Sequence, residues 1–298
     1  MEHVRFLERP ELRSPVMVGA FAGWNDAASC ATAAVRLLVE QWKAEKFADI
    51  DPEDFYDFSV NRPRVHLDEQ LVRRLEWPAN EFFFHRAEDQ QRDFIFFLGQ
   101  EPSLKWRTFT SNITAVAREM GASAVLMSGA LIADVVHTLP VHVSGSSNDP
   151  DLRERMSALN ITSSRYEGPT GIVGTMLDRC LQEDLKSISI WGAVPHYIPT
   201  TANPKVVASL LRHMRDLLSF ELDLTELDGA ARRFENQVSD AVQSNEQLRD
   251  YIREREARER ESTTTEPARM EDFPSGETVV RSLEEFLRQN RLRPPGEN

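Results

Sequence analysis

Short apolar runs, each followed by a segment of helical periodicity, constrain the fold of this chain more than any other feature. Such runs occupy residues 16–21 (VMVGAF), 124–131 (AVLMSGAL) and 187–194 (SISIWGAV), and turn residues bound them. Runs of this kind are typical of strands in a parallel sheet that helices cover on both sides. The sequence therefore predicts an α/β layer fold.

Further elements extend this pattern. Additional strands are predicted at residues 55–60, 81–85, 93–98 and 141–143. One helix is predicted to begin at residue 26, and others at residues 108–120, 150–159, 171–185 and 204–218. Because no helix separates the strands predicted between residues 55 and 98, some pairing there should be antiparallel. Residues 1–225 are therefore expected to form a three-layer α/β/α domain with a mixed, mostly parallel sheet.

The pattern changes after residue 225, where a helical extension is predicted. It comprises a long helix over residues 226–261, a linker over 262–277 and a short helix over 278–292. Apolar residues in the long helix recur at gaps of four and three, as in a heptad seam. The candidate seam residues are Leu227, Phe234, Val238, Asn245, Leu248 and Ile252. This seam either packs on the body of its own chain or joins two copies in a homo-oligomer, with Asn245 selecting the register.

Composition excludes several classes of function. The chain has 298 residues with 35 basic and 48 acidic side chains, a formal charge of −13. Nucleic-acid binding needs clustered positive charge, which the body lacks, and no apolar run is long enough to span a membrane. Two cysteines are too few for a structural zinc site, and no cofactor motif is present. With a charged N-terminal segment and no signal-peptide pattern, we expect a cytoplasmic protein without metal or cofactor.

Polar residues gather in the turns that follow the predicted strands, where ligands of open α/β sheets usually bind. The candidate pocket residues are Trp24, Asn25, Asp26, Glu101, Arg107, Asp134, His137, Gly168, Thr170, Gly171, His196 and Tyr197. Structural roles are the simpler reading of these residues: Asp26 caps the following helix, and Glu101 pairs with Arg107. Asp134 with His137 has the composition of a base and an orienting carboxylate, or of two metal ligands, but no catalytic motif supports a catalytic assignment.

Three functions remain open on this reading. The chain is a binding protein that acts through its surfaces, a hydrolase that uses the pocket residues, or a small-molecule-binding protein that uses the same pocket without chemistry. Convergence of the polar side chains in one cleft would favour an enzyme or a small-molecule site. Separate capping and pairing roles for each side chain would favour a binding protein.

Several of these turns, taken in order, resemble the proteasome assembly chaperone family in its bacterial form. The resemblance runs over residues 15–225 and is carried by Gly23-Trp24-Asn25-Asp26-Ala27, Phe55-Tyr56-Asp57-Phe58 with Arg62-Pro63, Glu101-Pro102 with Trp106-Arg107, Ala133-Asp134 with His137-Thr138, Tyr166-Glu167-Gly168-Pro169-Thr170-Gly171, and Pro195-His196-Tyr197 with Asn203-Pro204. It implies a phosphorylase/hydrolase-like α/β/α fold. It also implies a non-enzymatic chaperone or scaffold with protein partners, proteasome subunits among them.

Overall fold

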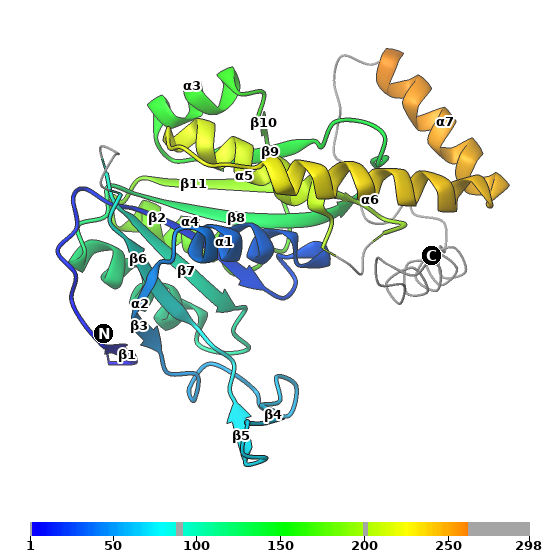
Figure 1. Cartoon of the computed structure of the whole chain (residues 1–298). Coiled ribbons are helices and arrows are strands. Elements are labelled where there is room, and N and C mark those ends of the chain that lie inside the picture. The colour runs from blue at the N-terminus through cyan, green and yellow to red at the C-terminus, as the bar shows by residue number, and fades with distance from the viewer. Residues whose placement is uncertain (1, 88–91, 199–201, 262–298) are drawn as a thin grey trace.

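The computed structural model describes residues 2–87, 92–198 and 202–261 (Figure 1). The strands are β1 (Val4–Phe6), β2 (Val16–Ala22), β3 (Glu45–Ile50), β4 (Arg64–Leu67), β5 (Arg73–Glu76), β6 (Glu81–His85), β7 (Phe94–Gln100), β8 (Ala124–Ala133), β9 (Val143–Ser147), β10 (Thr162–Ser163) and β11 (Ser187–Pro195). The helices are α1 (Cys30–Gln41), which follows a 3-10 turn at Ala27–Ser29, α2 (Trp106–Glu119), α3 (Pro150–Ala158), α4 (Ile172–Gln182), α5 (Pro204–Leu218), α6 (Thr225–Gln243) and α7 (Glu246–Glu261).

Within the described residues, nine strands form one sheet in the order β1-β3-β6-β7-β2-β8-β11-β9-β10. The four central strands, β7, β2, β8 and β11, run parallel. On one side of this centre, β1, β3 and β6 pair antiparallel, and so do β6 and β7. The β6–β7 pair confirms the antiparallel pairing predicted between residues 55 and 98. β9 is also antiparallel to β11. The sheet is therefore mixed, with a parallel centre.

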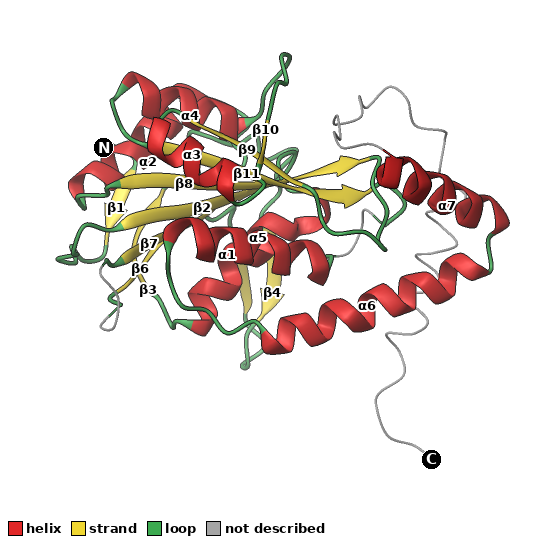
Figure 2. Cartoon of the chain, turned by 90° about the horizontal axis from the view of Figure 1, so that it is seen from above, coloured by secondary structure: helices red, strands yellow, loops and turns green. Residues whose placement is uncertain are grey.

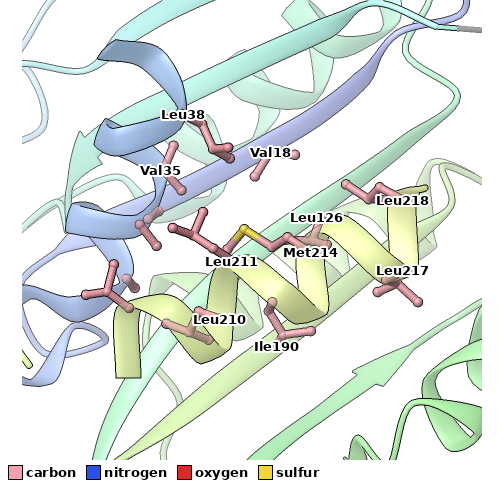
Figure 3. Packing of buried hydrophobic residues seen from close by; sticks show 14 of the residues in the cluster. Val18, Val35, Leu38, Leu126, Ile190, Leu210, Leu211, Met214, Leu217 and Leu218 are labelled. Carbon is pink, nitrogen blue, oxygen red and sulfur yellow. The ribbon is translucent and has the colours of Figure 1, made fainter. Parts of the chain in front are cut away.

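Helices cover both faces of this sheet, which confirms the three-layer prediction (Figure 2). Side chains of β2 alternate between the two faces: Val16 and Val18 face one apolar cluster, and Met17 and Phe21 face the other. The first cluster includes α1 and α5, whose apolar residues interlock over the central strands in Figure 3. The second includes α2 and α4. Since β2 is buried on both faces, nearly every position in it must be apolar or small.

Three predicted elements differ from the structure. The strand predicted at residues 141–143 shares only its last residue with β9, which begins at Val143. Residues 55–60 form turns rather than a strand, with Phe55 and Tyr56 buried, while β3, which was not predicted, pairs between β1 and β6. The single helix predicted over residues 226–261 is two helices, α6 and α7, because the helix is interrupted at Ser244 and Asn245. The predicted linker and short helix, residues 262–292, lie outside the described residues. In the part of the chain that the structure describes, no helix combines the length and apolar character that a bilayer span requires.

Candidate functional site

The carboxyl ends of the parallel strands β7, β2, β8 and β11 lie along one edge of the sheet, and the predicted pocket residues follow these ends. Among the described residues, the structure does not join these side chains in one hydrogen-bonded group. It divides most of them into two groups that are bound to different elements: one at the ends of β2 and β7, and one at the ends of β8 and β11.

Asn25, Glu101 and Gly171 meet at the ends of β2 and β7. The Asn25 amide donates to Glu101 Oε1 at 2.7 Å, and the same oxygen accepts from the backbone N–H of Ile172, the first residue of α4, at 2.9 Å. Gly171 lies so close to the Asn25 amide that a Cβ atom would collide with it. Glu101 therefore caps α4 and ties it to the turn after β2. The predicted Glu101–Arg107 ion pair is wrong, since among the described residues no such pair forms and Arg107 is exposed on α2.

Asp26 holds the start of α1, which confirms its predicted capping role. Its carboxylate accepts from the backbone N–H of Ala31 at 2.6 Å and of Thr32 at 3.3 Å, and also from the Thr32 hydroxyl. These amides belong to the first turn of the helix, where backbone donors have no intrahelical acceptor. Burial raises the pKa of Asp26, and the bonds from Thr32 and Ala31 oppose that shift.

Trp24, Gly168 and Thr170 are exposed on the loops that border this first group. Gly168 packs against the ring of Tyr166, whose hydroxyl donates to the carbonyl of Pro169 at 3.0 Å. Tyr166 thus ties the loop before α4 to itself.

His137 and Tyr197 lead the second group, at the ends of β8 and β11. The Tyr197 hydroxyl oxygen accepts from the His137 backbone N–H and lies 2.8 Å from Nδ1 of the same histidine. Nε2 lies 3.0 Å from the hydroxyl of Ser239 on α6. A consistent assignment has Tyr197 donating to Nδ1 and Nε2–H donating to Ser239. Burial lowers the pKa of His137 to about 4, so the ring is neutral at pH 7.

Asp134 binds α7 instead of His137. Its carboxylate accepts from the Tyr251 hydroxyl and lies 3.5 Å from Nε of Arg255, and its backbone carbonyl accepts from Arg255 at 2.7 Å. The His196 ring packs edge-on against Tyr251, with centroids 5.2 Å apart. Burial, together with Asp134, raises the pKa of Tyr251. Asp134 and His137 therefore hold different helices, and among the described residues no group of three potential metal ligands gathers.

The predicted seam lies between the two C-terminal helices and the body. Val238, Leu248 and Ile252 are buried in one cluster with Val136 and Tyr197, and Phe234 packs against it. Leu227 packs against the core cluster beside α1 and α5. In this arrangement, the seam is covered by its own chain, the first of the two alternatives.

Asn245 lies between α6 and α7, not inside one long helix as predicted. It precedes α7, and its side-chain oxygen accepts from the backbone N–H of Leu248 at 3.1 Å. This is the bond of a helix N-cap, so Asn245 begins a new helix at the point where the predicted one should have continued.

The partners that α6 and α7 supply to the second group were missed by sequence reasoning. They are Ser239, Tyr251 and Arg255, together with Lys205 of α5, whose ammonium lies 2.6 Å from Glu235 of α6 and donates to the His137 carbonyl. Tyr251 lies inside the apolar repeat, between Leu248 and Ile252. A tyrosine at such a position indicates that its hydroxyl makes a polar contact at the edge of a packed face. Tyr251 was therefore the feature of the sequence that could have indicated this contact.

Comparisons with known proteins agree with this fold. A model of the PAC2 family matches residues 20–242. A PAC2 family protein from Streptomyces avermitilis is 40% identical, with a TM-score of 0.74 over 80% of this chain and 99% of the other. A proteasome-assembly chaperone homologue from Mycobacterium tuberculosis is 36% identical, with a TM-score of 0.73 over 80% and 99%.

A more distant structure shares the fold. The archaeal proteasome activator PbaB from Pyrococcus furiosus is 19% identical, with a TM-score of 0.64 over 80% of this chain and 97% of its own. The sequence matches no curated protein. The family model covers most of the chain, and two bacterial structures exceed one third identity over four fifths of it. The chain belongs to the PAC2 family.

Proposed function

We propose that this protein is a non-enzymatic, cytoplasmic assembly chaperone that acts through protein–protein surfaces as a homo-oligomer, with proteasome subunits as its partners. Support comes from the likeness to the M. tuberculosis proteasome-assembly chaperone homologue, which extends over nearly the whole of that protein. The acidic balance of the chain is compatible with protein partners and unfavourable for nucleic acid.

The main support for a non-enzymatic function is that each polar strand-end residue has a separate structural role. Asp26 caps α1, Glu101 caps α4, and Asn25 links these two starts. Asp134 and His137 hold α7 and α6 in turn. A hydrolase or a small-molecule site needs several such groups aimed at one bound molecule, and here they are aimed at the protein's own helices.

The direct test uses the full-length chain and the proteasome α and β subunits of the same organism. The purified components are mixed at micromolar concentration and weighed by native mass spectrometry. We expect a stoichiometric complex of this chain with α subunits, and faster appearance of 20S particles when β subunits are added. A subunit mixture with serum albumin in place of the chain is the control. Separate masses for the chain and all subunits would overturn the proposal.

A second measurement addresses the enzymatic alternative. Generic ester, amide and phosphate substrates are incubated with the wild-type chain and with Asp134→Asn and His137→Gln variants. The proposal expects turnover no faster than buffer for all three proteins. Turnover by the wild type that both variants lose would favour the hydrolase instead.

A further inference from the structure

A β-hairpin projects from the body between β3 and β6, as Figure 1 shows. We name residues 60–77 the arm. Its strands, β4 and β5, pair only with each other among the described residues, as a separate two-stranded sheet. All eight strand residues are exposed. No residue of the arm therefore belongs to the buried clusters of the body.

One face of the arm is apolar. Val65 lies directly opposite Leu75, and Leu67 lies opposite Arg73. Because side chains alternate along a strand, Val65, Leu67 and Leu75 share a face, and each is 57% exposed. Trp77 continues this row beyond the end of β5. The other face carries polar residues only: Arg64, His66, Arg74 and Glu76. This is the pattern of a sheet face built to be covered.

The arm is an ordered element with a defined turn. Asp68 Oδ1 accepts from the backbone N–H groups of Gln70 and Val72 at 3.0 and 2.9 Å, and its Oδ2 accepts from Arg74 at 3.0 Å. At the base, the rings of Phe58 and Trp77 meet edge-on with centroids 4.8 Å apart. The apolar face is thus presented on a preformed hairpin, which lowers the entropy cost of docking.

Leu71 at the tip is the least expected residue of the arm. It is 78% exposed and has φ +59°, a left-handed conformation that favours glycine or asparagine. Neither burial nor backbone preference within the monomer accounts for a leucine at this position. A leucine at this position would be explained by contact with another surface.

The net charge of the arm differs in sign from that of the rest of the chain, and this favours an acidic surface as its partner. The arm holds four arginines and three acidic residues, whereas the other residues hold 31 of the 35 basic and 45 of the 48 acidic side chains. The arm is thus slightly positive and everything else in the chain is strongly negative. Arg73 lies on the apolar face itself, next to Leu75 in β5 and opposite Leu67. Opposite charge favours docking of the arm on the body of another copy and disfavours arm against arm.

From these observations, we infer that the apolar face of the arm docks on the acidic body of a second copy of this chain. The inference rests on the homo-oligomer part of the proposed function and names the surface that forms it. The predicted heptad seam is covered within the chain, whereas the arm carries the largest group of exposed apolar side chains among the described residues.

Sedimentation equilibrium of three full-length proteins tests this inference. The wild type should have at least twice the mass of one chain at about 20 μM. Leu75→Asp should weaken self-association at least tenfold. Leu181→Asp is the matched control: it makes the same change at a leucine of α4 that is 59% exposed, and it should leave the mass unchanged. Circular dichroism melting should confirm that all three proteins are folded.

A further variant, Arg73→Glu, reverses one charge on the apolar face without removing an apolar group, and it should also weaken association about tenfold. A wild-type monomer overturns both the arm inference and the homo-oligomer. A wild-type oligomer that Leu75→Asp leaves intact, or that Leu181→Asp disrupts equally, overturns the arm inference alone. The proteasome-binding experiment is independent of all these outcomes.

Discussion

The arm and the C-terminal helices are both additions to the α/β/α body, and they differ in what covers their apolar residues. On α6 and α7, Val238 and Ile252 are buried against Val136 and Tyr197 of the body. On the arm, Val65 and Leu75 face outward. Both regions have regular apolar spacing in the sequence. Regular apolar spacing therefore identifies a face that is covered in the assembled protein, but not whether the covering residues come from the same chain.

The two regions also differ in how they are fastened. His137, Asp134 and Lys205 of the body bind α6 and α7 through side-chain hydrogen bonds and an ion pair. The arm is held at its base by the Phe58–Trp77 contact and by Asn61, whose side-chain oxygen accepts from Ser103 at 2.9 Å. We therefore expect substitutions in the helices to change stability and substitutions in the arm to leave it almost unchanged.

The largest effect is expected for Val238→Asp. Val238 is fully buried, and a carboxylate there would lie in an apolar cluster without a partner. We expect α6 and α7 to detach at a cost of about 3 kcal/mol, which corresponds to a roughly hundredfold loss of amide-exchange protection in residues 225–261. Gln237→Asp, at the exposed neighbouring position, is the control and should retain protection. Equal protection in both variants would mean that this face is not packed on the body.

Acidification should loosen the same helices and spare the arm. His137 has a pKa of about 4 in the folded chain, lowered mainly by burial, against about 6.5 when exposed. Between these values, the unfolded state binds more protons, so stability rises with pH and is lost as pH falls from about 6.5 to about 4. We expect a loss of about 2 kcal/mol, discounted for partial solvent access.

Hydrogen exchange at pH 7, 5.5 and 4.5, corrected for intrinsic rates, measures this loss in α6 and α7. His137→Gln retains hydrogen-bonding groups but cannot titrate, and should reduce the pH dependence to the part due to His196 and His142, whose pKa values burial also lowers. The arm, residues 60–77, provides the internal reference and should show no matching change. A wild-type slope equal to that of His137→Gln would contradict the assigned role of His137.

A smaller effect is expected for Asn245→Ala. Because Asn245 caps α7, removing its side chain should cost about 1 kcal/mol in the free energy of unfolding. Asn245→Asp keeps an acceptor at the same position and should recover most of that loss. Chemical denaturation of both variants measures the difference. A more stable alanine variant would instead indicate a continuous helix through residue 245.

The smallest effect on stability is expected for Leu71→Asn. Asparagine tolerates the left-handed conformation at the tip better than leucine, and little burial is lost. The unfolding free energy should therefore stay equal or rise by about 0.5 kcal/mol. Thermal melting of the monomeric Leu75→Asp background, with and without Leu71→Asn, isolates this local effect. A drop of more than about 1 kcal/mol would show that the tip packs within its own chain.

Much of the body could be predicted because its signals are local. The strands β2, β8 and β11 are apolar runs, and the helix predicted at residues 204–218 coincides with α5 because Asn203 caps it and Pro204 begins it. β3 was missed because its sequence, EKFADI, begins with two charged residues and contains a third, so it does not form an apolar run. Phe55 and Tyr56 resembled a strand because they are buried, but they lie in turns.

The candidate site was harder to predict because its partners are remote in sequence. The capping role of Asp26 follows from its position just before a helix. The bond from Ile172 to Glu101 spans 71 residues, and that from Tyr251 to Asp134 spans 117. No local pattern specifies which distant group a carboxylate will meet. The apolar repeat of α6 and α7 was found, but its cover and its break at Asn245 depend on the tertiary structure.

The bonds between the body and α6–α7 also have a consequence for the order in which a growing chain can finish folding. His137 and Tyr197 are made before Ser239 and Tyr251, so Val136, Tyr197 and Ile198 have no cover until the last described helices leave the ribosome. Domains fold largely from the N-terminus during synthesis, and an uncovered apolar surface is prone to aggregate. α6 and α7 thus cover a body whose sheet can already be formed. A chain stalled before residue 225 is therefore expected to aggregate through this uncovered apolar surface.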